Sequence, residues 1–163
     1  MAQVAMDEAL YDLSERLPYQ INLKYERRES IMNLLNGRDV LTVLPTGFWK
    51  SLIFQMFVIS KSKLSLHNTR NNDRPTSSSW LVICPLESII EDQIVEAKSA
   101  GISASSLTDL TPDELSNNPP QIMFASAETV HDSYFLAVLK DPNSTLHISI
   151  SRLVVDESHT VER

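Results

Sequence analysis

The sequence has one cysteine and few basic residues, and both shortages limit what the chain can be. Cys84 is the only cysteine among 163 residues, so no disulfide framework can form within the chain. A single thiol is typical of a reducing compartment, and we expect the protein in the nucleus or the cytoplasm. Lysine and arginine number 14 against 21 acidic residues, which gives a net charge of −7. This charge gives no support for binding nucleic acid by bulk attraction, so any contact with phosphates has to be local.

Long hydrophobic runs are also absent. The longest nearly apolar stretch covers residues 52–59 and contains Gln55, which is far too short to cross a membrane. Asp7 and Glu8 interrupt the N-terminus before any apolar region, so we expect neither a signal peptide nor a membrane partner. The length suits one domain with a real core.

Apolar strands alternate with helices along most of the chain. We predict core strands at residues 40–44, 80–84, 121–124 and 152–155, and a weak strand at 102–107. We predict helices at residues 26–35, 51–59, 86–99 and 132–139, and a short helix after the capping box that begins at Thr111. Alternation of this kind implies βαβ units, and hence an α/β fold with a parallel sheet flanked by helices.

Two further segments complete the outline. Met6, Leu10, Leu13 and Leu17 recur at helical spacing before Pro18, which predicts an N-terminal helix that the proline ends. Residues 60–79 are polar and show no period, so we expect a surface loop there.

The main functional motif lies between the apolar runs at residues 39–44 and 52–59. It reads Leu44-Pro45-Thr46-Gly47-Phe48-Trp49-Lys50-Ser51. A strand, a tight loop and a helix that opens on Lys-Ser form the context of a phosphate-binding loop (P-loop). In such a loop, backbone N–H groups and the positive helix end face an anion, the lysine reaches the terminal phosphates, and the Ser hydroxyl binds magnesium.

A second signal is the strand that ends in Asp156 and Glu157, followed by His159. Parallel α/β sheets bind ligands at the carboxyl edge, where the phosphate loop would also lie. Asp156 would then hold the magnesium that Ser51 also contacts, and Glu157 would activate the attacking water. Taken alone, the Asp-Glu pair could equally be a helix cap.

Three ordered segments together resemble the RecQ-like DNA helicases of superfamily 2, which are related to the DEAD/DEAH-box proteins. The segments are LPTGFWKSLIFQ at residues 44–55, CPLESIIEDQ at 84–93 and VDESH at 155–159. The resemblance runs from about Leu23 onward and implies the first RecA-like domain of an ATP-dependent 3'–5' helicase. We therefore expect an N-terminal helical segment at 1–22 and a partial, C-terminally truncated RecA-like domain at 23–163.

The resemblance also implies roles for particular residues. Lys50 would bind the β and γ phosphates of ATP, Ser51 and Asp156 would hold Mg²⁺, and Glu157 and His159 would complete the catalytic set. The rest of the nucleotide site would consist of Arg27, Pro45, Thr46, Gly47, Phe48 and Trp49. Single-stranded or forked DNA would contact Pro85, Leu86, Ser88, Ser126 and Glu128.

The chain departs from the family pattern in three places. Trp49 replaces the loop glycine whose missing side chain lets the backbone approach phosphates, so the indole either obstructs the phosphate site or turns outward and stacks on a base. Arg27 stands where an adenine-reading glutamine is expected, and guanidinium can only donate hydrogen bonds; it is equally acceptable as a surface charge. The sequence ends at Arg163, and the second RecA-like domain that a motor needs is missing from it.

Two other functional classes stay open. One is a non-catalytic helicase relic that binds single-stranded DNA or a partner protein, and the other is an unrelated P-loop ATPase or kinase. Metal and thiol chemistry are not indicated: the histidines lack metal-ligand spacing, and Cys84, at the end of an apolar strand, reads as a small core residue.

Overall fold

The computed structural model describes residues 1–45, 50–68 and 78–156. The chain divides into two compact units. The helical unit is Met1–Pro75 with Ser99–Gly101, and the sheet unit is Thr76–Lys98 with Ile102–Arg163. The expected boundary between residues 22 and 23 stays a prediction.

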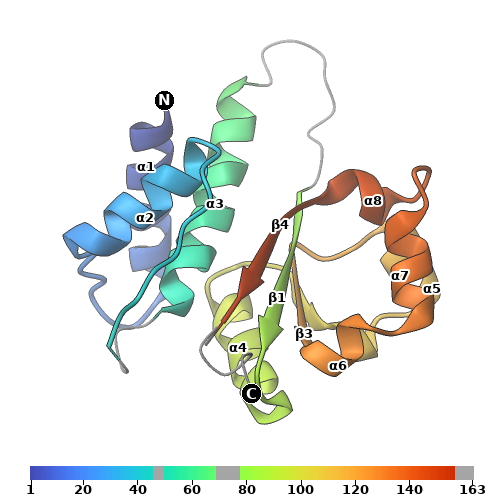
Figure 1. Cartoon of the computed structure of the whole chain (residues 1–163). Coiled ribbons are helices and arrows are strands. Elements are labelled where there is room, and N and C mark those ends of the chain that lie inside the picture. Colours follow the sequence, from blue (N-terminus) through green and yellow to red (C-terminus); the bar gives the residue numbers. More distant parts are fainter. Residues whose placement is uncertain (46–49, 69–77, 157–163) are drawn as a thin grey trace. The chain divides into compact units, whose positions relative to one another are not determined.

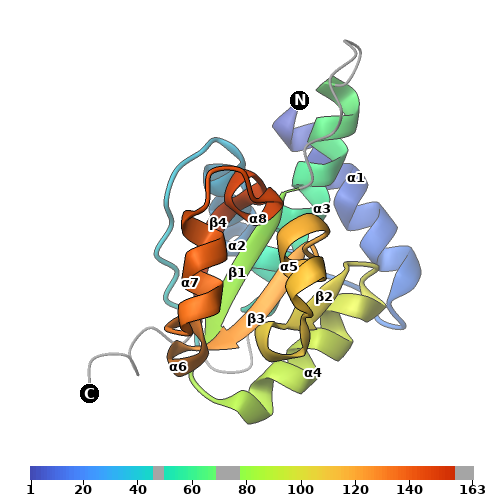
Figure 2. The same cartoon turned by 90° about the vertical axis from the view of Figure 1, so that its right-hand side faces the viewer.

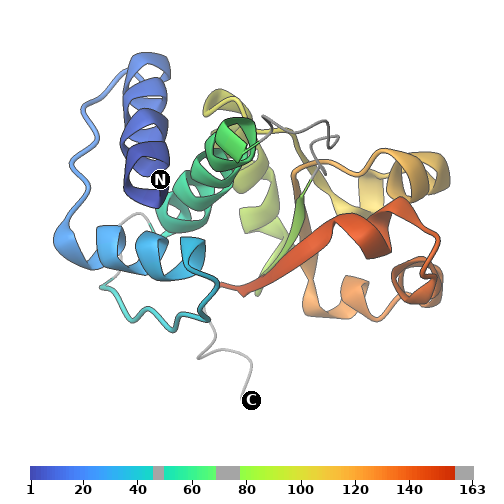
Figure 3. The same ribbon diagram turned by 90° about the horizontal axis from the view of Figure 1, so that it is seen from above.

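Three helices form the described core of the helical unit. They are α1 (Ala2–Arg16), α2 (Tyr25–Leu35) and α3 (Ser51–Asn68). Both α1 and α2 pack on α3 (Figures 1 and 3). The predicted N-terminal helix is confirmed, and it ends before Pro18. Its buried side chains are Ala5, Met6, Ala9 and Leu13.

Helix α2 ends where the sequence predicts. Gly37 adopts a φ of +80°, a conformation that favours glycine at a helix end. Its N–H donates to the Leu34 carbonyl at 3.0 Å, and the N–H of Arg38 donates to the Asn33 carbonyl at 3.0 Å. These two bonds satisfy carbonyls that the end of the helix would otherwise leave without donors.

The predicted surface loop at 60–79 is partly wrong, because α3 continues to Asn68. Two polar contacts with α1 accompany the extra turns: Lys63 forms an ion pair with Asp12, and His67 Nε2 lies 2.9 Å from Glu8 Oε2. A polar helical face that pairs with a neighbouring helix has no apolar period, so the pattern of the sequence resembles a loop. Residues 69–77 lie outside the described part, and Ser79 begins a strand.

The predicted core strand at residues 40–44 is also wrong. These residues belong to no strand of the described sheet, and Leu41 and Val43 are 82% and 87% exposed. Only alternate residues are sheltered, and Thr42 Oγ1 lies 3.2 Å from Ser30 Oγ of α2. An apolar run indicates extended, water-avoiding backbone, but it does not specify the strand that would pair with it.

A four-stranded parallel sheet forms the centre of the sheet unit (Figure 2). Its strands are β1 (Ser79–Cys84), β2 (Ala104–Ser106), β3 (Ile122–Ser126) and β4 (Ile150–Val155). The order is β2-β3-β1-β4, and every pair is parallel. The predicted α/β class with a parallel sheet is confirmed, and the weak strand predicted at 102–107 is shortened to three residues.

One face of this sheet packs under helices that the chain supplies between its strands. The helices are α5 (Pro112–Asn117), α7 (Ser133–Lys140) and α8 (Thr145–Ser149). Their buried Leu115, Phe135 and Leu146 cluster with Leu81 and Met123 of the strands. The capping box at the start of α5 is confirmed, with Thr111 and Glu114 bonded reciprocally. The sequence does not predict helix α8, so the predicted set of helices is incomplete here.

The remaining elements are short or lie at the carboxyl ends of strands. Helix α4 (Glu87–Ser99) follows β1, α6 (Ala127–Val130) follows β3, and a 3-10 turn, η1 (Leu107–Asp109), follows β2. Helix α4 buries Ile90 and Ala97. Leu86, the first residue of the helix predicted at 86–99, precedes the observed helix and is 59% exposed.

Candidate functional site

The carboxyl edge of the sheet brings several predicted site residues together. In the parallel register Cys84 of β1 lies opposite Ser126 of β3, and Ile83 lies opposite Val155 of β4. All three strands therefore end at the same edge, which is where parallel α/β sheets bind ligands.

Asp156 is held at this edge by the backbone ladder. Its N–H donates to the Ile83 carbonyl at 2.9 Å, so the pairing of β4 with β1 continues one residue past the strand. The predicted metal ligand thus stands directly beside the end of β1, as its place in the sequence predicts.

The environment of Cys84, at the carboxyl edge beside Asp156, shifts the pKa of its thiol. The thiol is fully buried, and burial raises its pKa from 9.0 to about 12, with the Asp156 carboxylate adding a smaller effect in the same direction. A thiol with so high a pKa is neutral and unreactive at neutral pH. The prediction that Cys84 is a core residue rather than a nucleophile agrees with this environment.

The first predicted DNA-contacting segment follows β1 at this edge. Pro85 is half-buried, and Leu86 and Ser88 are exposed. The Leu86 carbonyl accepts from the Ile89 N–H at 3.2 Å, so the segment bends into α4. Its surface is open to a ligand and carries no cationic side chain.

The second predicted segment starts at the end of β3. Ser126 is buried and caps α6, with its Oγ accepting from the Thr129 N–H at 3.2 Å. Glu128 is exposed. The serine hydroxyl is thus engaged in holding the turn, while Glu128 remains accessible.

Lys50 and Ser51 lie at the start of α3. The Lys50 carbonyl accepts from the Ile53 N–H at 3.1 Å, which begins the helix directly after the lysine. Ser51 is buried and Lys50 half-buried, whereas Pro45 before the loop is exposed. This start matches the predicted opening of a helix on Lys-Ser. Both residues belong to the helical unit and Asp156 to the sheet unit, so their proximity stays a prediction.

Several predicted residues lie outside the described part of the chain. They are Thr46, Gly47, Phe48, Trp49, Glu157 and His159. Their assigned roles stay predictions.

The side chain of Arg27 does not lie at the surface, as one of its two expected roles requires. It is only 7% exposed within α2, so its interpretation as a surface charge is wrong. A buried guanidinium needs hydrogen-bonding partners, and burial of this kind depends on tertiary packing that a single sequence does not display. The adenine-site role stays a prediction.

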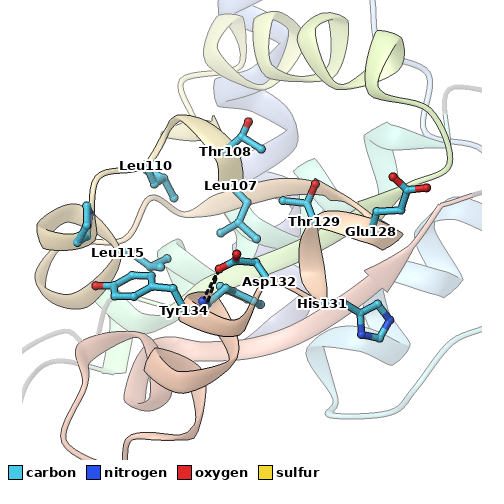
Figure 4. Close-up of a pocket in the computed structure, with 11 residues that line it drawn as sticks. Leu107, Thr108, Leu110, Leu115, Glu128, Thr129, His131, Asp132 and Tyr134 are labelled. Atoms are coloured by element: carbon cyan, nitrogen blue, oxygen red, sulfur yellow. Dashed lines mark hydrogen bonds between the residues drawn. The ribbon is translucent and has the colours of Figure 1, made fainter.

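The sheet unit also contains a pocket that the sequence does not predict. It lies between η1, α5, α6 and α7, has a volume of about 590 Å³ and is lined in part by Leu107, Glu128 and Tyr134 (Figure 4). Its residues come from four short segments without a common motif, so only the folded chain reveals it.

Two negative findings apply to the residues that the structure describes. No group of three or more metal-ligating His, Cys, Asp or Glu side chains occurs among them. Over the same ranges, the helices are too short or too polar to cross a membrane.

Comparison with known proteins identifies the family. The model of the DEAD/DEAH box helicase family matches residues 26–163, which is most of the chain. The chain therefore belongs to the DEAD/DEAH box helicase family.

Individual relatives narrow the likeness to the RecQ-like members. The chain is 29% identical to the ATP-dependent helicase SGS1 of Saccharomyces cerevisiae, over 95% of this chain and 10% of that protein. It is 28% identical to the RecQ-like DNA helicase blm-1 of Caenorhabditis elegans, over 97% of this chain and 15% of that protein. It is 26% identical to the ATP-dependent DNA helicase RecQ of a Synechocystis strain, over 85% of this chain and 27% of that protein.

These matches confirm the RecQ-like resemblance, and the matched part is a first RecA-like domain. The chain spans only about a tenth to a quarter of the length of these relatives.

Proposed function

We propose that this chain is the nucleotide-binding half of an ATP-dependent 3'–5' DNA helicase, which binds ATP with Mg²⁺ and single-stranded or forked DNA. One observation carries the proposal. The carboxyl edge of one parallel sheet holds Asp156 and both predicted DNA-contacting segments. A proposed Mg²⁺ ligand and the proposed DNA contacts on one edge would let a motor domain couple nucleotide binding to DNA binding.

Lys50, Ser51 and Asp156 are the residues proposed to hold the nucleotide. The Lys50 ammonium would neutralise the β and γ phosphates. The Ser51 hydroxyl and the Asp156 carboxylate are oxygen ligands of the kind that Mg²⁺ prefers. When bound there, Mg²⁺ would supply positive charge that stabilises the negative charge of the phosphates.

Glu157 and His159 are proposed to complete the reaction. Glu157 would orient the attacking water and accept its proton, and His159 would couple the nucleotide state to the DNA track. A second RecA-like domain is the proposed partner that would supply the moving half of the motor.

The proposed DNA contacts rely on backbone rather than on cationic side chains. Leu86 and Ser88 lie exposed where α4 begins, and free N–H groups in a first helical turn can donate to phosphate oxygens. Contacts of this kind position a strand without reading its sequence, and they are compatible with a net charge of −7.

Equilibrium ATP binding, with and without Mg²⁺, tests the proposal. We expect Mg²⁺-dependent binding that Lys50→Ala removes. Lys61→Ala, a matched lysine on the same helix, should leave it unchanged. Absence of ATP binding together with single-stranded DNA binding would favour the non-catalytic relic, for which Trp49 in the phosphate loop is the supporting feature.

A further inference from the structure

The pocket of the sheet unit has an apolar floor. Leu107, Leu115 and Phe135 line it and are each less than a tenth exposed, because they belong to the core cluster beneath. Tyr134 forms part of the wall and is 46% exposed. The volume of about 590 Å³ lies within the range of sites that bury a ligand or a few side chains.

The rim of this pocket is acidic. Glu128 and Asp132 line it and are exposed, and Asp109 and Asp113, each adjacent in sequence to a lining residue, are exposed as well. None of the lining residues, all within the described part of the chain, is a lysine or an arginine. Figure 4 shows Leu110, Leu115 and Tyr134 at one end of the pocket and Glu128 and His131 at the other.

Hydrogen-bonded helix caps hold two walls of the pocket. Asp132 Oδ1 accepts from the N–H groups of Tyr134 at 2.9 Å and Phe135 at 3.0 Å, which fixes the start of α7 (Figure 4). The reciprocal capping box of Thr111 and Glu114 fixes the start of α5 on the other side. A site whose walls are held by helix caps is largely formed before a ligand arrives, which lowers the entropic cost of binding.

We propose that this pocket binds a segment of a partner protein in which an apolar side chain is flanked by lysine or arginine. The apolar side chain would fill the space over Leu107, Leu115 and Phe135, beside Tyr134. The flanking cations would lie against Glu128 and Asp132, where complementary charge favours encounter and register. A nucleic-acid strand in the pocket is disfavoured, since its phosphates would lie against the carboxylates of Glu128 and Asp132. This inference does not depend on the proposed nucleotide site, and Glu128 is the residue of the pocket that also belongs to the proposed DNA contacts.

Fluorescence anisotropy with short labelled peptides tests the proposal on the full 163-residue chain. The probe carries a central leucine flanked by lysines. One matched peptide replaces the lysines by glutamates, and another replaces the leucine by serine. We expect the probe to bind, both matched peptides to bind at least about fivefold more weakly, and the affinity to fall with salt.

Paired variants locate the contact. Glu128→Lys and Tyr134→Ala should each weaken the probe at least about fivefold. Glu91→Lys and Tyr11→Ala, which change exposed residues of α4 and α1, should not. Amide shifts in the unmodified protein supply a second measurement that requires no variant to fold, and the probe should move the signals of Thr108, His131 and Tyr134.

Four results would overturn the proposal. They are no binding of the probe, equal binding of the glutamate peptide, probe-induced shifts that spare the pocket, and displacement of the probe by an oligothymidylate that itself shifts the pocket signals. The last result would identify the pocket as a nucleobase site instead.

Discussion

At the scale of single residues, Asp156 and Cys84 form one electrostatic unit. Burial raises the pKa of the Cys84 thiol, and the Asp156 carboxylate, which the backbone bond to Ile83 holds beside the end of β1, adds a smaller effect in the same direction. The position of Asp156 follows from its place after an apolar strand, so the sequence predicts it. The burial of Arg27, in contrast, is not predicted, because the neighbouring residues in the sequence give no sign that its side chain is buried.

The thiol of Cys84 should resist alkylation in the native protein. Its pKa of about 12 keeps it protonated at neutral pH, and burial blocks the reagent. We expect iodoacetamide labelling to be slow in buffer and fast in denaturant, as followed by mass spectrometry. Fast native labelling would show that the end of β1 is open.

The raised pKa of the Cys84 thiol makes the stability of the folded chain depend on pH. An unfolded thiol ionises near its ordinary pKa of 9.0, whereas the folded one keeps its proton to about 12. The stabilising contribution is therefore fully present below pH 9.0 and is lost as pH rises through this window. Urea unfolding across the window should show the stability of the native chain falling relative to that of Cys84→Ala, and a constant difference would contradict the raised pKa.

At the scale of elements, apolar patterns predict the strands that are buried on both faces. Strands β1 and β3 are nearly continuous in burial, and the sequence locates both to within two residues. The segment at 40–44 has a similar composition but is half exposed. Composition reports the tendency to avoid water, whereas a strand also needs a partner for its backbone, which the local sequence does not contain.

Helix α8 is a second element that the local sequence does not predict. It has five residues, which is too few for a helical period to be read from the sequence. Ser144 caps it, with its Oγ accepting from the His147 N–H at 3.1 Å. Leu146 then enters the core cluster, while Ile148 is 64% exposed.

This contrast within one helix gives a stability prediction. Leu146→Ala should lower the free energy of unfolding by about 2–5 kcal/mol, because it leaves a cavity under the sheet. Ile148→Ala in the same helix should change it by less than about 0.5 kcal/mol. Urea denaturation of both variants measures the difference, and equal effects would show that α8 does not pack as described.

At the scale of the whole molecule, an acidic chain is expected to bind DNA only through local contacts. We predict weak binding of an oligothymidylate to these 163 residues, with an affinity that falls as salt rises. Ser88→Glu should weaken it, since it adds charge at the start of α4, and Ser133→Glu on α7 serves as the matched control. A salt-independent affinity would argue against phosphate contacts.

DNA binding by these residues does not imply that they unwind a duplex. A polypeptide of these 163 residues should not unwind duplex DNA above background, because a single RecA-like domain cannot alternate its grip on a strand. A strand-displacement assay checks this expectation, and clear unwinding would contradict it.

Lys50 and Ser51 are proposed to form a nucleotide site, and Trp49 is proposed to limit its affinity. Titration of a fluorescent ATP analogue in Mg²⁺ against the native chain, Trp49→Gly and Trp49→Gly/Lys50→Ala tests this most directly. We predict that Trp49→Gly gains about tenfold or more in affinity, or about 1.4 kcal/mol, because the glycine removes the indole that is proposed to obstruct the phosphate site. Loss of Lys50 should then abolish binding, because its charge holds the terminal phosphates. Equal affinity of the native chain and Trp49→Gly would show that the loop accommodates tryptophan, and binding that survives Lys50→Ala would contradict the proposed site.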